Sequence, residues 1–187
     1  MKKAVFFDRD GTINVEAGYI RDLKNLRLIE GAAESIKKLK EAGFIIILVT
    51  NQSGPARNYY SEDWVNTLNN TVNNMLVENG TSLDDIYYCP HLPDGIVPEY
   101  TKDCDCRKPN IGMFLKAKEK HNIDFSQSFM VGDKATDVEA GHNAGCKSIL
   151  LKTGYGEKVL KGEYQNIPNA DYIATDISDA CNWILKS

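Results

Sequence analysis

Two hydrophobic patterns alternate along this 187-residue chain. Unbroken apolar runs rich in β-branched and aromatic residues, at 4–7 and 44–49, predict buried strands over 3–8 and 44–49. Apolar residues recur at helical spacing over 31–42 and 61–79, and Ser61 is a suitable N-cap for the second of these helices. Shorter strands are predicted at 86–88, 128–131, 148–151 and 171–174, and further helices near 111–121, 134–144 and 176–186.

This regular alternation of strands and helices predicts an α/β fold. We expect a Rossmann-like three-layer α/β/α sandwich with a mostly parallel central sheet. The chain has no internal repeat, linker or low-complexity segment, and 42% of its residues are hydrophobic, which is enough for one good core. The prediction is a single domain over residues 1–187.

The charge pattern disfavours two classes of partner. The chain has 22 basic and 26 acidic residues, a net charge of −4, with no block of lysine or arginine. We therefore expect no binding to nucleic acid or to an anionic membrane. The first residues, Met1-Lys2-Lys3 followed by a predicted strand, do not have the pattern of an apolar signal core with a small-residue cleavage site, and no apolar run approaches the about 18 residues of a membrane span. We expect a soluble cytoplasmic protein and, because no exposed apolar helix face stands out, a monomer.

Two aspartates directly follow the first predicted strand, in the segment Asp8-Arg9-Asp10-Gly11-Thr12. Ligands of open α/β sheets bind where the carboxyl ends of the strands meet. Neighbouring carboxylates repel each other unless a cation or a shared proton relieves them, and Mg²⁺ prefers such oxygen ligands. The pair is suited to phosphoryl transfer, with one aspartate as nucleophile and the other as acid and base. A turn with two solvated aspartates is the alternative.

Three later segments carry related chemistry at predicted strand ends or helix starts. Thr50-Asn51-Gln52-Ser53-Gly54 could hold a phosphate through hydroxyl and backbone N–H groups, and Arg107-Lys108-Pro109 places two cations before a helix. Asp133 and Asp137 are spaced to share one face of a helix turn, with Lys134 between them. Taken singly, these segments also fit an ordinary turn, surface cations and helix-start carboxylates.

Together and in this order, the four segments resemble the motif set of haloacid-dehalogenase-type phosphatases. The resemblance implies that Asp8 forms an aspartyl-phosphate and that Asp10 is the acid and base. It also implies that Thr50 and Lys108 stabilise the phosphoryl oxygens. The implied Mg²⁺ ligands are Asp8, the backbone carbonyl of Asp10, and Asp133, with Asp137 in support.

A second cluster combines three thiols and one imidazole in two tight pairs. Cys89-Pro90-His91 and Cys104-Asp105-Cys106 match a closed tetrahedral Zn²⁺ site with the ligands Cys89, His91, Cys104 and Cys106. Buried free cysteines are an alternative, and so is a disulfide in an oxidising compartment. With four protein ligands the zinc would be structural, folding the loop over about 89–106 that delivers Arg107 and Lys108.

With this loop, nearly the whole chain resembles the D-glycero-D-manno-heptose-1,7-bisphosphate 7-phosphatase family. That resemblance implies a small sugar phosphate as substrate, release of its 7-phosphate, and a place in heptose-nucleotide synthesis for lipopolysaccharide or another surface glycan. The predicted elements fill the stretches from Asp10 to Thr50 and from Thr50 to Lys108, so we expect no large cap domain. The residues implied to contact the substrate are Glu16, Ala17, Gly18, Tyr19, Thr50, Asn51, Gln52, Ser53, Arg57, Arg107, Lys108 and Lys134.

Pro55, Asn58 and Leu92 depart from the family pattern. Since proline fixes φ and lacks an N–H donor, we expect a differently shaped loop over 53–60, which concerns substrate choice more than the chemical step. Two alternatives remain. One is a histidinol-phosphate phosphatase, which shares the scaffold and the zinc loop. The other is a zinc-stabilised binding module without activity, which would leave the co-occurrence of the acidic motifs and Lys108 unexplained.

Overall fold

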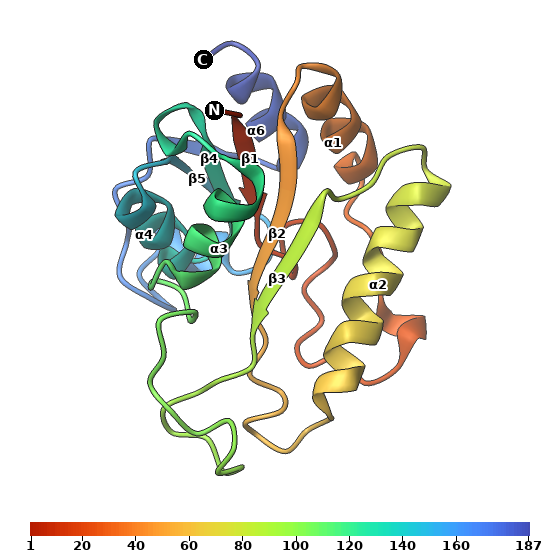
Figure 1. Ribbon diagram of the computed structural model, residues 1–187, viewed down its shortest axis with the longest axis vertical. Helices are drawn as coiled ribbons and strands as arrows, with labels where there is room; N and C mark the ends of the chain where they lie inside the picture. The colour runs from red at the N-terminus through yellow and green to blue at the C-terminus, as the bar shows by residue number, and fades with distance from the viewer.

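The computed structural model describes residues 1–187 and contains one six-stranded sheet in the order β3-β2-β1-β4-β5-β6 (Figure 1). Every neighbouring pair of strands is parallel, which confirms the predicted sheet. The strands are β1 (Ala4–Phe7), β2 (Ile45–Asn51), β3 (Asp85–Cys89), β4 (Phe129–Gly132), β5 (Lys147–Leu151) and β6 (Tyr172–Ala174).

Helices cover both faces of the sheet, as the predicted three-layer arrangement requires (Figure 1). They are α1 (Ala32–Glu41), α2 (Glu62–Glu78), α3 (Gly112–His121), α4 (Ala135–Ala144), α5 (Gly156–Leu160) and α6 (Ile177–Ile184), with 3-10 turns at Leu23–Asn25 and Phe125–Gln127. The sequence pattern missed α5 and both 3-10 turns because segments of three to five residues are too short to display a periodicity. No helix has the length and apolar character needed to cross a membrane.

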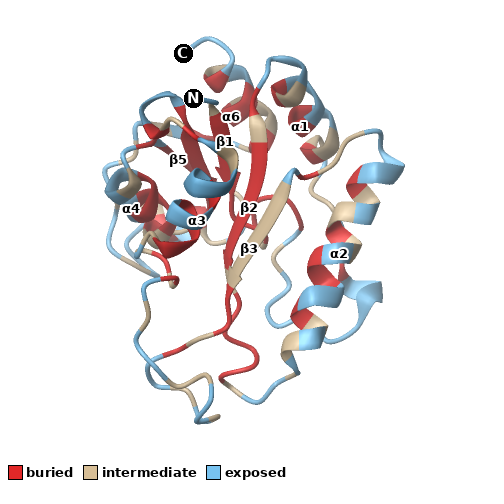
Figure 2. Ribbon diagram, viewed as in Figure 1, coloured by how far each residue is buried: buried red, intermediate tan, exposed pale blue.

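The side chains of each central strand divide between two cores. On β1, Val5 and Phe7 pack with residues of α1, α2 and α6, whereas Ala4 and Phe6 pack with residues of α3 and α4. Since successive strand residues point to opposite faces, a strand buried on both sides must be apolar at every position. Figure 2 shows the central strands as buried and the edge strand β3 as mostly intermediate, while the helices carry both buried and exposed residues.

The parallel sheet brings the chemically interesting segments to one edge. Asp8 follows β1, Thr50 lies near the end of β2, and Asp133 follows β4, and these three strands are direct neighbours. The long loop after β3 extends beyond the same carboxyl ends of the strands (Figure 1). No second sheet or helical cap is inserted, so this edge is covered by loops alone.

We predict that Phe6→Ala lowers the free energy of unfolding by about 3–5 kcal/mol, because it empties the centre of the core on the α3 side. The Phe6 ring lies 4.6 Å from that of Phe114 and 6.1 Å from that of Phe125, between centroids. Urea unfolding measures the loss. Val77→Ala, at an exposed position on α2, should change stability by less than about 0.5 kcal/mol. Equal effects of the two substitutions would contradict this description of the core.

Candidate active site

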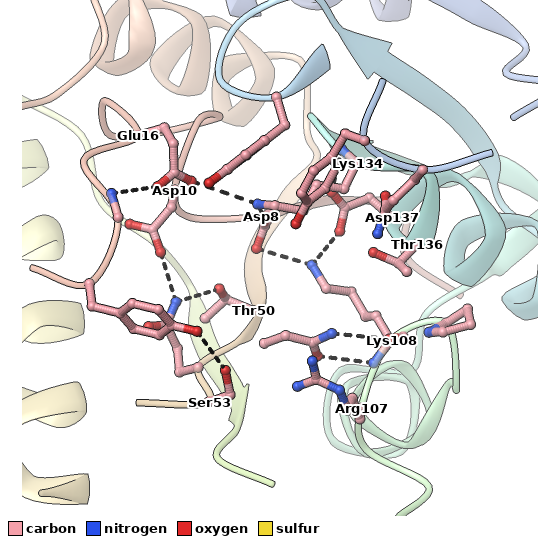
Figure 3. A pocket seen from close by; sticks show the side chains of 18 of the residues that line it. Asp8, Asp10, Glu16, Thr50, Ser53, Arg107, Lys108, Lys134, Thr136 and Asp137 are labelled. Carbon is pink, nitrogen blue, oxygen red and sulfur yellow. Dashed lines mark hydrogen bonds and ion pairs between the residues drawn. The ribbon is translucent and has the colours of Figure 1, made fainter. Parts of the chain in front are cut away.

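A pocket of about 420 Å³ opens at the carboxyl edge of the sheet (Figure 3). Its lining residues come from the loops after β1 and β5, from the end of β2 and the loop after it, from Lys134 and the first turn of α4, and from the segment that precedes α3. Among the predicted residues, those that line it are Asp8, Asp10, Glu16, Gly18, Tyr19, Thr50, Asn51, Gln52, Ser53, Arg57, Arg107, Lys108, Lys134 and Asp137. Ala17 is exposed and is the one predicted substrate residue that does not line the pocket, while Asp133 is fully buried beside it.

Asp8 and Lys108 form a buried ion pair at the floor of the pocket. The Lys108 ammonium lies 3.0 Å from Asp8 Oδ1 and 2.6 Å from Asp137 Oδ1, and it donates a hydrogen bond to the carbonyl of Val49. Burial by itself would raise the pKa of Asp8, but Lys108 and Lys134 outweigh burial and lower it to about 2. Asp8 is therefore ionised at neutral pH, as a nucleophile must be.

Three buried carboxylates, those of Asp8, Asp133 and Asp137, offer oxygen atoms that all lie within 4.8 Å of one another. Burial raises the pKa of Asp133 to about 7, and the two neighbouring carboxylates add to this rise. The backbone packs closely around Asp133, because a Cβ at Gly11 or Gly154 would collide with its Oδ2. A compact set of hard oxygen donors that repel one another fits a divalent cation such as Mg²⁺.

Asp10 lies on the opposite side of Asp8 from Lys108 in the view of Figure 3. Its carboxylate accepts hydrogen bonds from Asn14 Nδ2 and Gln52 Nε2, both at 2.9 Å, and it is ion-paired with Arg9. Both of its oxygens are thus held by donors, while the residue still lines the pocket. A carboxyl group so placed can exchange a proton with a ligand bound above Asp8.

The end of β2 and the residues after it connect the pocket to the Arg107-Lys108 segment. Asn51 and the backbone of Lys108 form a reciprocal pair of hydrogen bonds, each of 3.0 Å, which fixes where Lys108 enters the site. Gln52 Nε2 donates to Thr50 Oγ1 at 2.9 Å, and Ser53 Oγ lies 3.3 Å from the Tyr19 hydroxyl. The hydroxyls of Thr50 and Ser53 therefore line one wall in fixed positions.

The structure also brings the four predicted zinc ligands together. The closest separations among the Sγ atoms of Cys89, Cys104 and Cys106 are 3.0–3.5 Å, and His91 Nδ1 lies 3.3 Å from Cys106 Sγ. No disulfide is formed. Sulfur atoms bound tetrahedrally at about 2.3 Å from one ion would be about 3.8 Å apart, slightly more than these separations. The donor set and its convergence fit Zn²⁺.

The loop that carries these ligands also makes hydrogen bonds near two arginines of the pocket, Arg57 and Arg107. Arg107 Nη1 donates to the carbonyl of His91 at 3.0 Å. The backbone N–H groups of Ile96 and Val97 donate to the carbonyl of Ala56, at 2.8 and 3.2 Å, next to Arg57. The cysteine and histidine cluster thus supports the positions of Arg57 and Arg107 through the backbone.

Six lining residues were missed by sequence reasoning: Tyr60, Pro109, Thr136, Tyr155, Tyr164 and Gln165. Tyr155 and Tyr164 stack with their ring centroids 4.3 Å apart. They belong to the chain after β5, and no motif identifies them. One usable signal was that a strand beside β4 ends at the same edge of the sheet, so its following loop also borders the crevice.

Comparisons with known proteins agree with this geometry. A model of the HAD-hydrolase-like family matches residues 105–180. The D-glycero-D-manno-heptose-1,7-bisphosphate 7-phosphatase of Thermosynechococcus vestitus is 47% identical over 187 residues, covering 98% of this chain and 95% of the relative. The D-glycero-beta-D-manno-heptose-1,7-bisphosphate 7-phosphatase of Escherichia coli K12 is 42% identical, covering 98% and 94%.

A solved structure is similar over the same length. The D,D-heptose 1,7-bisphosphate phosphatase of B. bronchiseptica, crystallised with magnesium and phosphate, superimposes with a TM-score of 0.86 at 29% identity, covering 98% of each chain. The enzyme of the same name from Burkholderia thailandensis has a TM-score of 0.71 over the whole of both chains, and its 24% identity supports the fold alone.

We predict that Lys108→Met lowers the free energy of unfolding at pH 7, without added Mg²⁺, by about 3–5 kcal/mol, because it leaves buried carboxylates unpaired. In the unchanged chain the pKa of Asp8 is lowered from 3.8 to about 2, so the pairing stabilises the fold above pH 4 and is lost as the pH falls through 2. The deficit of the variant should therefore shrink as the pH falls below about 4.

Urea unfolding at several pH values measures this deficit. Lys120→Met is the matched control, because Lys120 pairs with Asp85 at the surface, where such a pair contributes at most about 1 kcal/mol. A deficit for Lys108→Met that is small, or that does not change with pH, would rule out the proposed strength of the buried pair.

Proposed function

The chain belongs to the D-glycero-D-manno-heptose-1,7-bisphosphate 7-phosphatase family of haloacid-dehalogenase-type phosphatases, and we propose that it removes the 7-phosphate of that bisphosphate through an aspartyl-phosphate. The observation that carries the proposal is the ionised, buried Asp8 beside Lys108 at the floor of an open polar pocket. The product would supply heptose-nucleotide synthesis for lipopolysaccharide or another surface glycan. A cytoplasmic location and a monomeric state stay predictions.

In the first step, a carboxylate oxygen of Asp8 attacks phosphorus and the bond from phosphorus to the sugar oxygen breaks. Asp10 gives its proton to that leaving oxygen. In the second step, Asp10, now a carboxylate, takes a proton from a water molecule whose oxygen attacks the phosphorus. The bond from phosphorus to the Asp8 oxygen breaks, which releases inorganic phosphate and regenerates the Asp8 carboxylate and protonated Asp10. The Thr50 hydroxyl and the Lys108 ammonium stabilise the phosphoryl oxygens throughout, because an in-line transfer depends mainly on positioning and charge neutralisation.

Asp8, the backbone carbonyl of Asp10, and Asp133 would hold Mg²⁺, with Asp137 in support. When bound, the ion neutralises the combined negative charge of the phosphate and the carboxylates. The magnesium and phosphate in the B. bronchiseptica enzyme support this assignment.

The rest of the substrate would be recognised by residues that line the outer part of the pocket, which we call its rim. Arg57 and Arg107 line the pocket and can bind the second phosphate of a bisphosphate, while Glu16, Gly18, Tyr19 and Ser53 offer polar groups to the sugar hydroxyls. Asn58 lies in the left-handed region with φ of 55°, in the loop that also contains Pro55. This loop is therefore where we expect substrate choice to differ within the family.

We predict that Asp8→Asn lowers Mg²⁺-dependent phosphate release by at least about 10³-fold, because the amide cannot act as the nucleophile. The circular dichroism spectrum should be unchanged. Asp63→Asn, at an exposed position on α2, is the control and should keep full activity. The assay panel contains both anomers of the heptose bisphosphate and histidinol phosphate. Faster turnover of histidinol phosphate would favour the alternative substrate, and unchanged turnover by Asp8→Asn would refute the mechanism.

We also predict one tightly held Zn²⁺ per chain, measured by elemental analysis of the purified protein. Cys104→Ser should lose most of the zinc and raise KM, because the loop that supports Arg57 and Arg107 depends on the ion. Cys146→Ser removes a buried thiol outside the cluster and should keep both the zinc and KM. Full zinc content in Cys104→Ser, or none in the unchanged chain, would contradict the assignment.

A further inference from the structure

Arg9, between the two aspartates of the first motif, has a side chain that is only 1% exposed and does not line the pocket. Its guanidinium reaches Asp10 Oδ2, Gln52 Oε1 and Asn69 Oδ1, each at 2.9 Å. We propose that Arg9, anchored by Asn69, is a positioning residue that holds Asp10 in place to protonate the leaving oxygen. The proposal rests on the function proposed above, in which Asp10 is the acid.

Because Arg9 is buried, its hydrogen-bond donors must be satisfied by acceptors of the protein. A guanidinium removed from water is costly unless its donors are satisfied by well-placed acceptors. Arg9 reaches both Asp10 oxygens, with Nη2 lying 2.9 Å from Oδ2 and Nε 3.3 Å from Oδ1. The backbone N–H of Arg9 hydrogen-bonds to Asp8, and any substitution of the side chain keeps that group. The Arg9 side chain itself does not line the pocket and bonds to Asp10, Gln52 and Asn69, so the effect of changing it on the reaction should pass through Asp10 or Gln52.

Asn69 reaches the network from outside the site. It lies on α2 with only 2% of its surface exposed, on the helix face that carries the buried Val65, Leu68 and Val72. An amide on such a face costs free energy unless it is hydrogen-bonded. Its Oδ1 accepts from Arg9 Nη1, while its Nδ2 has no partner. The single bond that Asn69 makes with its side chain is therefore the one that holds Arg9.

Gln52 connects Arg9 and Asp10 to Thr50, whose hydroxyl is proposed to stabilise the phosphoryl oxygens. Its Oε1 accepts from Arg9, which leaves its Nε2 to donate to both Asp10 Oδ2 and Thr50 Oγ1, each at 2.9 Å. The orientation of this amide thus depends on Arg9. Loss of the guanidinium fork would leave Asp10 held only by Asn14 and by a Gln52 amide that has itself lost a partner, and would loosen the link between Asp10 and Thr50.

A misplaced acid slows only those substrates whose leaving oxygen needs a proton. In the first step the bond from phosphorus to oxygen breaks while Asp10 transfers its proton to that oxygen. A sugar alkoxide is strongly basic and needs the proton, whereas 4-nitrophenolate is stable enough to leave without it. The ratio of kcat/KM for these two leaving groups therefore reports the position of the acid, and a general loss of folding or of phosphate binding would lower both values together.

The experiment measures kcat/KM of the full chain with Mg²⁺ on the heptose bisphosphate and on 4-nitrophenyl phosphate. Arg9→Lys keeps the charge and loses the fork. We expect it to lower the value for the sugar phosphate by about 10²-fold, within the range of general acid catalysis, and that for the aryl phosphate by less than about 5-fold. Asn69→Ala should lower kcat/KM for the sugar phosphate about 10-fold and again affect the aryl phosphate less. Asn70→Ala, the exposed neighbour on the same helix, should change neither value.

Asp10→Asn is the reference that separates the two proposals. If it lowers both substrates equally, Asp10 is not the acid and the mechanism proposed above fails. If it is selective for the sugar phosphate while Arg9→Lys and Asn69→Ala lower both substrates equally or neither, the positioning role is refuted and the mechanism stands. Thermal unfolding accompanies each variant, and Asn69→Ala decides the outcome if Arg9→Lys does not fold.

Discussion

The structure of the site depends on one buried ammonium group, that of Lys108. It lies between Asp8 and Asp137 with 3% of the residue exposed, and its burial is offset by these two carboxylates and by the carbonyl of Val49. Asp8 follows β1, Asp137 lies in the first turn of α4, and Lys108 comes from the loop before α3. Three separate segments must therefore meet at hydrogen-bond distance, since an unpaired charge in this place would be strongly destabilising.

The parallel sheet makes that meeting possible. Alternate side chains of β1 pack in two different cores, so a shift of the strand would disturb the packing on both faces of the sheet. The carboxyl end of β1 is thereby fixed between β2 and β4, which hold Thr50 and precede Asp133. The packed cores thus fix the positions of the residues at the floor of the pocket. The rim consists of loops that do not belong to either core, so their sequence can vary more freely.

The sequence predicted the floor of the site far better than its rim. Unbroken apolar runs and strand-end acids identify β1, Asp8 and Asp133, because a doubly buried strand has a pattern that few other structures share. Tyr155 and Tyr164 were missed since they lie in irregular chain, where position depends on tertiary contacts. Arg9 was overlooked for another reason: sequence alone does not reveal that a charged residue between two acids turns away from solvent.

A long loop between β3 and α3, and not an inserted domain, borders the open side of the pocket. Residues between β3 and α3 have little regular structure, so ordering them costs conformational entropy that packing alone repays poorly. Hydrogen bonds to Ala56 and from the Tyr100 hydroxyl to Glu62 attach this loop to the neighbouring loop and to α2. With zinc bound as proposed, its folding would be driven by metal coordination, which needs few residues. The pocket could then vary in specificity through this loop and the segment near Pro55 without disturbing the buried ion pair.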